Sequence, residues 1–209
     1  MSNSPKNRVA VAVSGSGRSL QNFLDKAEGS EYEISGVIAS RGDCRGCEIA
    51  KENGLPLLVE SFSFKRLDEV SEPVYKWLKE QKIEWVALAG FLKPFPVQSG
   101  WEKRIINIHP ALLPKHGGKG MYGERVHEAV IEAGDKRTGA TIHFVNDKYD
   151  EGPIIAQVMV KIPTQLTPHE LADRVFGAEC ELYPKVLDKL VSGSLPNKNG
   201  SIERYHHEY

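Results

Sequence analysis

The sequence predicts an α/β fold in which a mostly parallel, twisted, Rossmann-like sheet carries helices on both faces. The first observation is that short apolar runs alternate with helical patterns through the first half of the chain. The second is the run EWVALAG at 84–90, which is apolar almost throughout, as central parallel strands are. The third is that only the short segment KYDEG separates two later β patterns, which predicts a C-terminal antiparallel hairpin.

The elements of the first half follow from hydrophobic periodicity. Apolar runs with β character predict strands at 8–13, 33–39, 55–60, 84–90 and 104–109. Between them, apolar residues spaced three and four apart predict helices beginning near Ser19 and spanning 47–54 and 66–81. Gly54 stands where a left-handed residue commonly follows a helix, so it marks the end of the second one.

The second half is expected to hold the hairpin strands within 139–147 and 152–162 and a long helix within 167–193. Thr167 and Glu170 have the spacing of a capping box at the start of that helix, and Pro168 suits its first position. We therefore expect a single domain over 1–192, followed by a polar, loosely ordered tail at 193–209.

Composition narrows the range of partners and compartments. The 209 residues include 27 basic and 28 acidic ones, a balance that favours neither nucleic acid nor a membrane as the partner. The three cysteines form no disulfide framework, and no apolar run approaches the roughly 18 residues of a membrane span. Because the N-terminus also lacks the apolar core of a signal peptide, we expect a cytoplasmic protein.

A turn rich in glycine and serine, SGSGRS at 14–19, joins the first strand to the first helix. Small residues let the backbone approach a ligand closely, and amides at a helix N-terminus attract anions, so the turn is a candidate phosphate site to which Arg18 adds charge. It lacks the Gly-Lys-Ser/Thr of a Walker A loop, and Leu20 replaces the third glycine of a dinucleotide fingerprint. A tight turn without a ligand is the alternative.

Asn107 and His109 end the fifth predicted strand, directly before Pro110. Residues two apart on a strand point the same way, and ligands of open α/β sheets bind at the carboxyl ends of the strands. An amide donor beside an imidazole can stabilise an oxyanion and move a proton. The hairpin turn offers three candidate carboxylate partners for the histidine, Asp147, Asp150 and Glu151. The alternatives are an asparagine that ties down a loop, a buried structural histidine and an ordinary turn aspartate.

Cys44 and Cys47 have the Cys-x-x-Cys spacing in CRGC. A structural zinc site needs four ligands and the sequence has no second cysteine pair, so we expect no metal site. A redox pair is one interpretation, and two reduced thiols at the start of a helix is the one we favour.

Four segments, SGSGRSLQ, INIHPALLP, GATIHFV and YDEGPII, occur in this order and together resemble the folate-dependent formyltransferases over roughly residues 8–190. Within that family, the chain is most similar to members that formylate glycinamide ribonucleotide in de novo purine synthesis. The resemblance implies the Rossmann-like formyltransferase fold, 10-formyltetrahydrofolate as co-substrate and no metal. It leaves monomer and homodimer both open.

The resemblance also implies roles for particular residues. The positions that match the catalytic trio of the family are Asn107, His109 and Asp150. Those that match its nucleotide-binding residues are Gly17, Arg18, Ser19 and Glu179, and those that match its folate pocket are Arg66, Leu92, Lys93, Pro94, Phe95 and Asn107. The chain departs from the family at Arg18-Ser19 and in a glycine-rich loop at 115–123, which we interpret as a mobile flap.

Three alternatives remain at this level. A formyltetrahydrofolate deformylase would use the same constellation with water as acceptor, but that family normally carries an additional N-terminal domain. A methionyl-tRNA formyltransferase normally adds a C-terminal domain, and a basic one would help to bind RNA, whereas we expect the core here to end near residue 192 and the charge is balanced. A non-catalytic nucleotide- or folate-binding protein would not need the intact Asn, His and Asp.

Overall fold

The computed structural model describes residues 5–195 and 202–206. Its sheet has eight strands in the order β3-β2-β1-β4-β5-β6-β7-β8. Parallel pairs precede the antiparallel pair β6–β7, so the predicted fold class is confirmed. By internal contacts the chain divides into two compact units, one made of the residues up to Ile106 with Leu187–Leu195, the other of Asn107–Val186 with the last strand.

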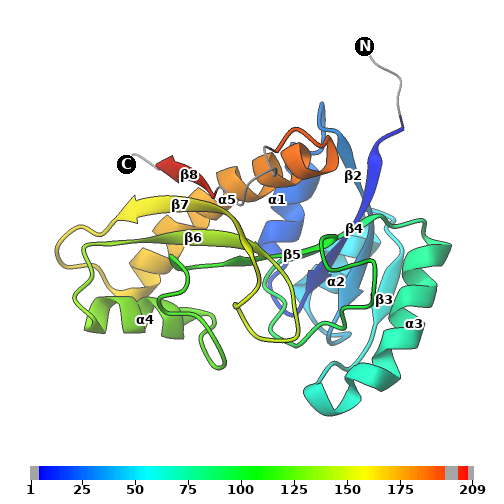
Figure 1. Cartoon of the computed structure of the whole chain (residues 1–209), viewed down its shortest axis with the longest axis horizontal. Coiled ribbons are helices and arrows are strands. Elements are labelled where there is room, and N and C mark those ends of the chain that lie inside the picture. The colour runs from blue at the N-terminus through cyan, green and yellow to red at the C-terminus, as the bar shows by residue number, and fades with distance from the viewer. Residues whose placement is uncertain (1–4, 196–201, 207–209) are drawn as a thin grey trace. The chain divides into compact units, whose positions relative to one another are not determined.

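The first unit is the doubly wound part predicted from the alternating pattern (Figure 1). Its elements are β1 (Asn7–Val13), α1 (Arg18–Lys26), β2 (Tyr32–Ala39), α2 (Arg45–Glu52), β3 (Leu57–Val59), the 3-10 helix η1 (Phe64–Arg66), α3 (Leu67–Glu80) and β4 (Trp85–Leu88). Strand β1 pairs in parallel with β2 and β4, and β2 pairs in parallel with β3. Val9 and Val13 of β1 are fully buried, as expected for a central strand.

Helices pack closely on this sheet where glycine replaces a side chain. Gly36 of β2 faces α3, and a Cβ there would lie 2.5 Å from the Trp77 ring. Gly46 of α2 packs on Val13 of β1, where an added Cβ would lie 2.6 Å from a valine methyl carbon. Gly54 has φ 63°, so the predicted left-handed residue after α2 is confirmed.

The second unit carries the hairpin (Figure 1). Its elements are β5 (Ile105–His109, whose first two residues belong to the first unit), α4 (Glu124–Glu132), β6 (Arg137–Phe144), β7 (Ile154–Lys161), α5 (Pro168–Val191, whose last residues belong to the first unit) and β8 (Glu203–His206). The register of β6 and β7 shifts between Ile142 and His143. The predicted capping box is confirmed, because the Glu170 amide donates to the Thr167 hydroxyl at 3.2 Å and the Thr167 amide to the Glu170 carboxylate at 2.8 Å.

Two elements differ from the sequence prediction. Helix α4 lies at the end of the segment interpreted as a flap, where Val126 and Val130 form its buried stripe. The glycines that precede it hid this short helical period. Glu203–His206 of the tail expected to be loosely ordered forms β8, which pairs in parallel with β7. This strand has little apolar pattern of its own, so its conformation is set by the edge with which it pairs.

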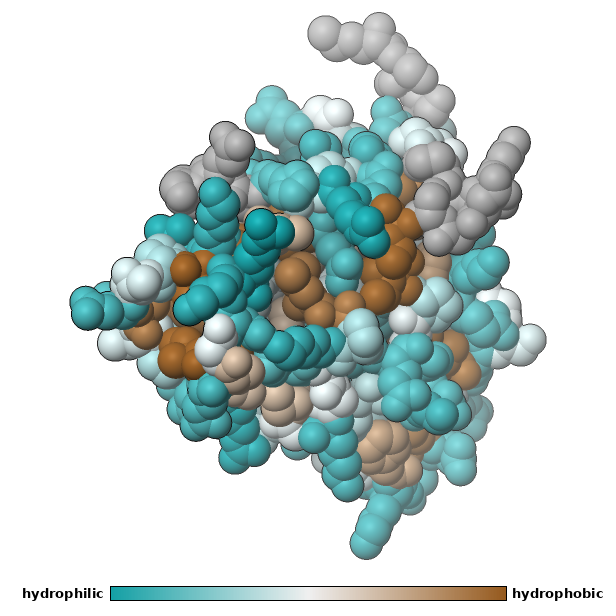
Figure 2. Space-filling model, turned by 60° about the vertical axis from the view of Figure 1, so that its left-hand side comes forward, coloured by the Kyte–Doolittle hydropathy of each residue, from teal (hydrophilic) through white to brown (hydrophobic). Residues whose placement is uncertain are grey.

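The surface is mainly hydrophilic on the face that Figure 2 shows, with separate hydrophobic groups. The large apolar side chains most exposed among the described residues are Val59, Phe64, Leu92 and Tyr122. Within 5–195 and 202–206, no helix is long and apolar enough to cross a membrane.

Candidate active site

Strand β5 delivers the first two candidate residues where it ends. Asn107 is half-buried and His109 is 3% exposed. Pro110 follows directly, has no amide hydrogen for the ladder and so ends it. Both side chains contact the same polar cluster, as expected for residues two apart on a strand.

Asp150 reaches this cluster from the turn between β6 and β7. Its backbone is left-handed with φ 59°, and its carboxylate accepts the Gly118 amide at 2.9 Å. Gly152 lets the turn close tightly, because a Cβ there would lie 1.7 Å from the Phe144 carbonyl oxygen. The Asp150 side chain is 11% exposed and lies 3.4 Å from His109, Oδ2 to Nδ1. The structure therefore brings Asn107, His109 and Asp150 together.

His143, which was not assigned a role from the sequence, completes the cluster. It is 2% exposed on β6, and its Nε2 lies 3.1 Å from Asn107 Nδ2 and 3.6 Å from Asp150 Oδ1. Its Nδ1 donates to the Phe144 carbonyl at 2.9 Å, so in the neutral ring Nε2 accepts the Asn107 amide. The sequence signal was a histidine inside the apolar strand pattern GATIHFV.

The protonation of His109 is balanced between opposing influences. Burial lowers the pKa of its imidazole, aided by the nearby His143 and His116, whereas Asp150 and the His116 carbonyl act to raise it. The net pKa lies below the ordinary value for histidine, so the neutral ring predominates at neutral pH. However, Nε2 lies 2.8 Å from the His116 carbonyl and Nδ1 faces Asp150, so both nitrogens face acceptors. Only the imidazolium can donate to both.

The pKa of Asp150 is lowered as well, but for a carboxyl group a lower pKa favours the charged form. Burial alone raises the pKa of this carboxyl, but the contact with His143, the attraction of His109 when that ring is protonated, and the Gly118 amide together hold it below its ordinary value. A charged carboxylate thus stands beside a neutral histidine that can gain a proton.

The loop after β5 closes over this cluster. Lys115 and His116 both pair with Asp135, His116 at 2.7 Å between Nε2 and Oδ2. Gly117 of this loop packs directly against Leu113, because an added Cβ would lie 2.3 Å from a methyl carbon of that residue. In this arrangement the His116 carbonyl occupies the donor direction of His109 Nε2.

The glycine-rich turn stands at the N-terminus of α1, in the first unit. Gly17 occupies the N-cap with φ 67°, and a Cβ on it would lie 2.9 Å from Gly46 Cα and 2.8 Å from an Ile49 methyl carbon. Gly17 has no side chain to accept the first amides of the helix, which suits an external anion. Arg18 is exposed and Ser19 is half-buried.

Ser14 ties this turn to the segment predicted to line the folate pocket. Its hydroxyl accepts the Leu92 amide at 3.0 Å and the Ser40 hydroxyl at 2.7 Å. Leu92 is 47% exposed and Lys93 is exposed, so both are accessible. Ser14 belongs to the predicted turn, but its linking role depends on pairing between distant segments and has no signal in the local sequence.

The other predicted folate residues lie in varied surroundings. Pro94 is half-buried, whereas Phe95 is 4% exposed and stacks on Phe62 with ring centroids 5.9 Å apart, so Phe95 serves the core as well. Arg66 is exposed and paired with Glu69 at 2.9 Å, so a folate carboxylate would have to compete with this partner. Glu179, the predicted nucleotide ligand, is half-buried on α5 in the second unit.

Metal ligands do not accompany these groups in the part of the chain described. Among residues 5–195 and 202–206, no three or more His, Cys, Asp or Glu side chains come together in a way that could hold a metal ion. The chemistry that the cluster itself offers is hydrogen-bond donation by Asn107 and proton movement between His109 and Asp150.

Known proteins are similar to this chain in sequence and in fold. The family model for formyl transferase matches residues 7–187. A chloroplastic phosphoribosylglycinamide formyltransferase of Arabidopsis thaliana is 42% identical over 191 residues, covering 87% of this chain and 64% of the relative. The human trifunctional purine biosynthetic protein adenosine-3 is 34% identical over 203 residues, covering 94% of this chain and 20% of its own length.

Solved structures agree with the sequence relatives. Phosphoribosylglycinamide formyltransferase from Anaplasma phagocytophilum superposes with a TM-score of 0.84 at 33% identity, covering 98% of this chain and all of that one (100%). The Coxiella burnetii enzyme, solved with CHES, has a TM-score of 0.85 at 28% identity, covering 96% of this chain and 100% of its own.

The chain spans less than two thirds of the length of two plant relatives, 64% of the Arabidopsis protein and 61% of the one from Vigna unguiculata. The family match nevertheless covers most of the present sequence and includes Asn107, His109, His143 and Asp150. The chain belongs to the formyl transferase family.

Proposed function

We propose that the protein transfers the formyl group of 10-formyltetrahydrofolate to the amine of glycinamide ribonucleotide, a step of de novo purine synthesis. The observation that carries the proposal is the buried contact of His109 with Asp150, 3.4 Å apart, with His143 joining Asp150 to Asn107. The names of the relatives, which are phosphoribosylglycinamide formyltransferases or trifunctional purine proteins, support the same substrates.

Asn107 would stabilise the negative oxygen of the tetrahedral intermediate. One hydrogen of its amide engages His143 Nε2, which fixes the orientation of the side chain and leaves the second hydrogen for a substrate oxygen. A fixed donor needs no reorganisation as charge develops, and one such donor contributes about 3 kcal/mol to transition-state stabilisation.

His109 would supply the second donor. Its ring is neutral at rest because burial lowers its pKa, but an oxyanion forming beside it favours the protonated form. Asp150 stabilises this imidazolium through its nearby carboxylate. For His109 Nε2 to meet a substrate oxygen, the His116 carbonyl must move away, which is the movement that we assign to the glycine-rich loop.

Asp150 would also direct the proton. The attacking amine becomes positively charged and must lose a proton as the folate nitrogen gains one. A carboxylate whose pKa is held below its ordinary value stays charged and can hold a water molecule that relays this proton. The pathway requires no covalent enzyme intermediate and no metal.

The binding residues remain proposals for each unit separately. In the first unit, Gly17, Arg18 and Ser19 would hold the nucleotide phosphate at the N-terminus of α1, while Leu92 and Lys93 would contact the folate. In the second unit, Glu179 would bind the nucleotide. We place this reaction in the cytoplasm, although the two plant relatives are chloroplastic.

An assay with and without the acceptor tests the proposal. The protein is incubated with 10-formyltetrahydrofolate, and tetrahydrofolate, formate and formylated nucleotide are measured in the presence and absence of glycinamide ribonucleotide. Transfer that depends on the nucleotide supports the proposal. Formate released without it would assign a deformylase, and no turnover in either arm would assign a binding protein.

A further inference from the structure

Cys44 and Cys47 are placed closely enough to react with each other. Their sulfur atoms lie 3.5 Å apart, and the two residues are 5% and 1% exposed. The Cys47 amide donates to the Cys44 carbonyl at 2.9 Å, which closes a four-residue turn. Such a turn holds its end Cα atoms within about 7 Å, close to the range that a disulfide spans.

The same turn is fastened to the glycine-rich turn by consecutive contacts. The Ser40 amide donates to the Val13 carbonyl at 3.1 Å, the Ser40 hydroxyl donates to Ser14 at 2.7 Å, and the Gly46 amide donates to the Gly15 carbonyl at 3.2 Å. All these residues belong to the first unit. The segment that ends β2 and begins α2 therefore sets the position of residues 14–17.

The cysteine turn (residues 44–47) and the glycine-rich turn (residues 14–19) are in close van der Waals contact. A Cβ on Gly17 would lie 2.9 Å from Gly46 Cα, and one on Gly46 would lie 2.6 Å from a Val13 methyl carbon. Gly46 stands between the two cysteines in the sequence. A change in the backbone of the cysteine turn must therefore displace the glycine-rich turn, because packed groups in such contact cannot move independently.

We propose that Cys44 and Cys47 are a peroxide-sensitive dithiol whose closure to a disulfide lowers the affinity of the adjacent glycine-rich turn for the nucleotide phosphate. The coupling to affinity rests on the proposed function, whereas formation of the disulfide does not. Closing the bond brings the sulfur atoms from 3.5 Å to about 2.05 Å and so shifts the turn that holds Gly46.

The reaction balances with hydrogen peroxide as the oxidant. The Cys44 thiolate attacks one peroxide oxygen, the O–O bond breaks and the departing hydroxide takes up a proton, leaving a sulfenic acid on Cys44. The Cys47 sulfur then attacks the Cys44 sulfur, the S–S bond forms, the S–O bond breaks and water leaves with the thiol proton. Two thiols lose two electrons in total, and one peroxide becomes two waters.

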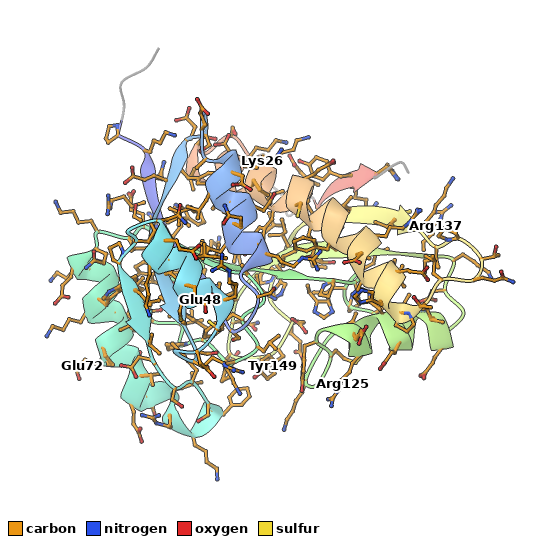
Figure 3. The ribbon with its side chains drawn as sticks, turned by 180° about the vertical axis from the view of Figure 1, so that it is seen from behind. Lys26, Glu48, Glu72, Arg125, Arg137 and Tyr149 are labelled. Carbon is orange, nitrogen blue, oxygen red and sulfur yellow. The ribbon has the colours of Figure 1, made fainter. Side chains whose placement is uncertain are left out.

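The order of attack follows from the surroundings. Burial raises the pKa of the Cys47 thiol to about 11, and its sulfur contacts the Arg41 carbonyl at 3.3 Å, so Cys47 rests as a thiol. Cys44 is the more exposed of the two and stands at the N-cap of α2, whose outer side carries Glu48 (Figure 3). Of the two sulfur atoms, that of Cys44 is therefore the first to meet a small oxidant.

The first test measures disulfide formation in the full chain and does not require an activity assay. Protein reduced beforehand is treated with hydrogen peroxide, and its free thiols and intact mass are measured before and after addition of dithiothreitol. We expect the loss of two of the three thiols and of two hydrogen atoms, fully reversed by dithiothreitol. A peptide map must place the bond between Cys44 and Cys47. Three remaining thiols, or a bond that involves Cys180, would overturn the dithiol.

The second measurement is the binding of glycinamide ribonucleotide to both forms by calorimetry. We expect the oxidised protein to bind roughly tenfold more weakly, the size of one lost charge-assisted hydrogen bond. Cys44→Ala and Cys47→Ala should each abolish the response, and Cys180→Ala should retain it. Equal affinities of oxidised and reduced protein, or a response that persists in both alanine variants, would overturn the coupling. If the reduced protein binds no nucleotide, the proposed function fails while the mass and thiol results still decide the dithiol.

Discussion

The polar cluster around Asp150 and the glycine-rich turn before α1 are built by different means. The cluster consists of buried and half-buried side chains from β5, β6 and the hairpin turn, each held by a neighbour within 3.6 Å. The turn consists of backbone and missing side chains, with Gly17 fitted against Gly46 and an exposed Arg18 beside it. A site of the first kind depends on which charge each group carries, whereas one of the second kind depends on shape.

This difference predicts opposite responses to substitution. In the cluster, replacing a side chain by one of the same shape but different charge should stop the chemistry and leave the fold intact. In the turn, adding one methyl group where the packing is tight, at Gly17, should disturb the fold, while removing the nearby charge should weaken binding only modestly.

The largest effect is expected for Asp150→Asn. The amide preserves the shape but removes the charge that stabilises protonated His109, so kcat should fall by roughly 10²–10⁴-fold while folate binding is retained. Steady-state kinetics and calorimetric titration of the folate measure the two quantities. Glu151→Gln is the matched control, since that neighbouring carboxylate is exposed and pairs with Lys148 at 3.5 Å. Unchanged turnover in Asp150→Asn would remove Asp150 from the mechanism.

Gly17→Ala should be the most damaging change in the glycine-rich turn. Its φ of 67° is unfavourable for alanine, and the added Cβ would overlap Gly46, so we expect the free energy of unfolding to fall by about 2 kcal/mol. Urea unfolding followed by circular dichroism measures this loss. In Gly15→Ala the added Cβ has no atom within 4 Å, and its stability should match that of the wild type. Equal stability of all three proteins would mean that the close packing is not required.

The sequence predicted the residue types of both regions, because local rules act at Gly17, Asn107 and His109. Gly17 stands in a local strand–turn–helix pattern, and Asn107 and His109 share a face because of strand geometry alone. Local rules also placed the capping box at Thr167.

Long-range pairing explains what the sequence did not predict. His143 enters the cluster only because β6 pairs in a particular register, with a shift at this residue. The link from Ser14 to Leu92 joins residues 78 positions apart. Likewise, β8 follows the edge of β7 rather than a pattern of its own, and the strong glycine signal before α4 masked a helix of nine residues.

Arg18→Ala removes a charge from the glycine-rich turn, which otherwise depends on shape, and so tests the contrast between this turn and the Asp150 cluster. Arg18 is exposed, so its contribution is a charge-assisted contact at the helix N-terminus, and the Michaelis constant for the nucleotide should rise roughly tenfold. That for the folate should stay the same. Lys26→Ala, at the far end of α1 (Figure 3), is the control and should change neither constant. Equal increases for both substrates would contradict the phosphate assignment.

The smallest effect is expected for His127 of α4. Its substitution tests whether burial lowers the pKa of a histidine near the cluster. His127 is 4% exposed, its Nδ1 has no hydrogen-bond partner among the described residues, and burial with nearby His109 lowers its pKa to about 4. In the unfolded chain the pKa returns to 6.5. Between these values the unfolded chain binds a proton that the folded protein does not, so stability falls as pH falls through this window.

His127→Gln should flatten this pH dependence, because glutamine cannot take up the proton. From about pH 7 to about pH 5, the wild type should lose about 1–2 kcal/mol more than the variant, measured by urea unfolding at both values. His169→Gln is the control, since that histidine is 76% exposed and should leave the pH dependence unchanged. If the wild type and His127→Gln lost equal stability, His127 would accept its proton inside the fold. Burial would then not be what lowers the pKa of His127.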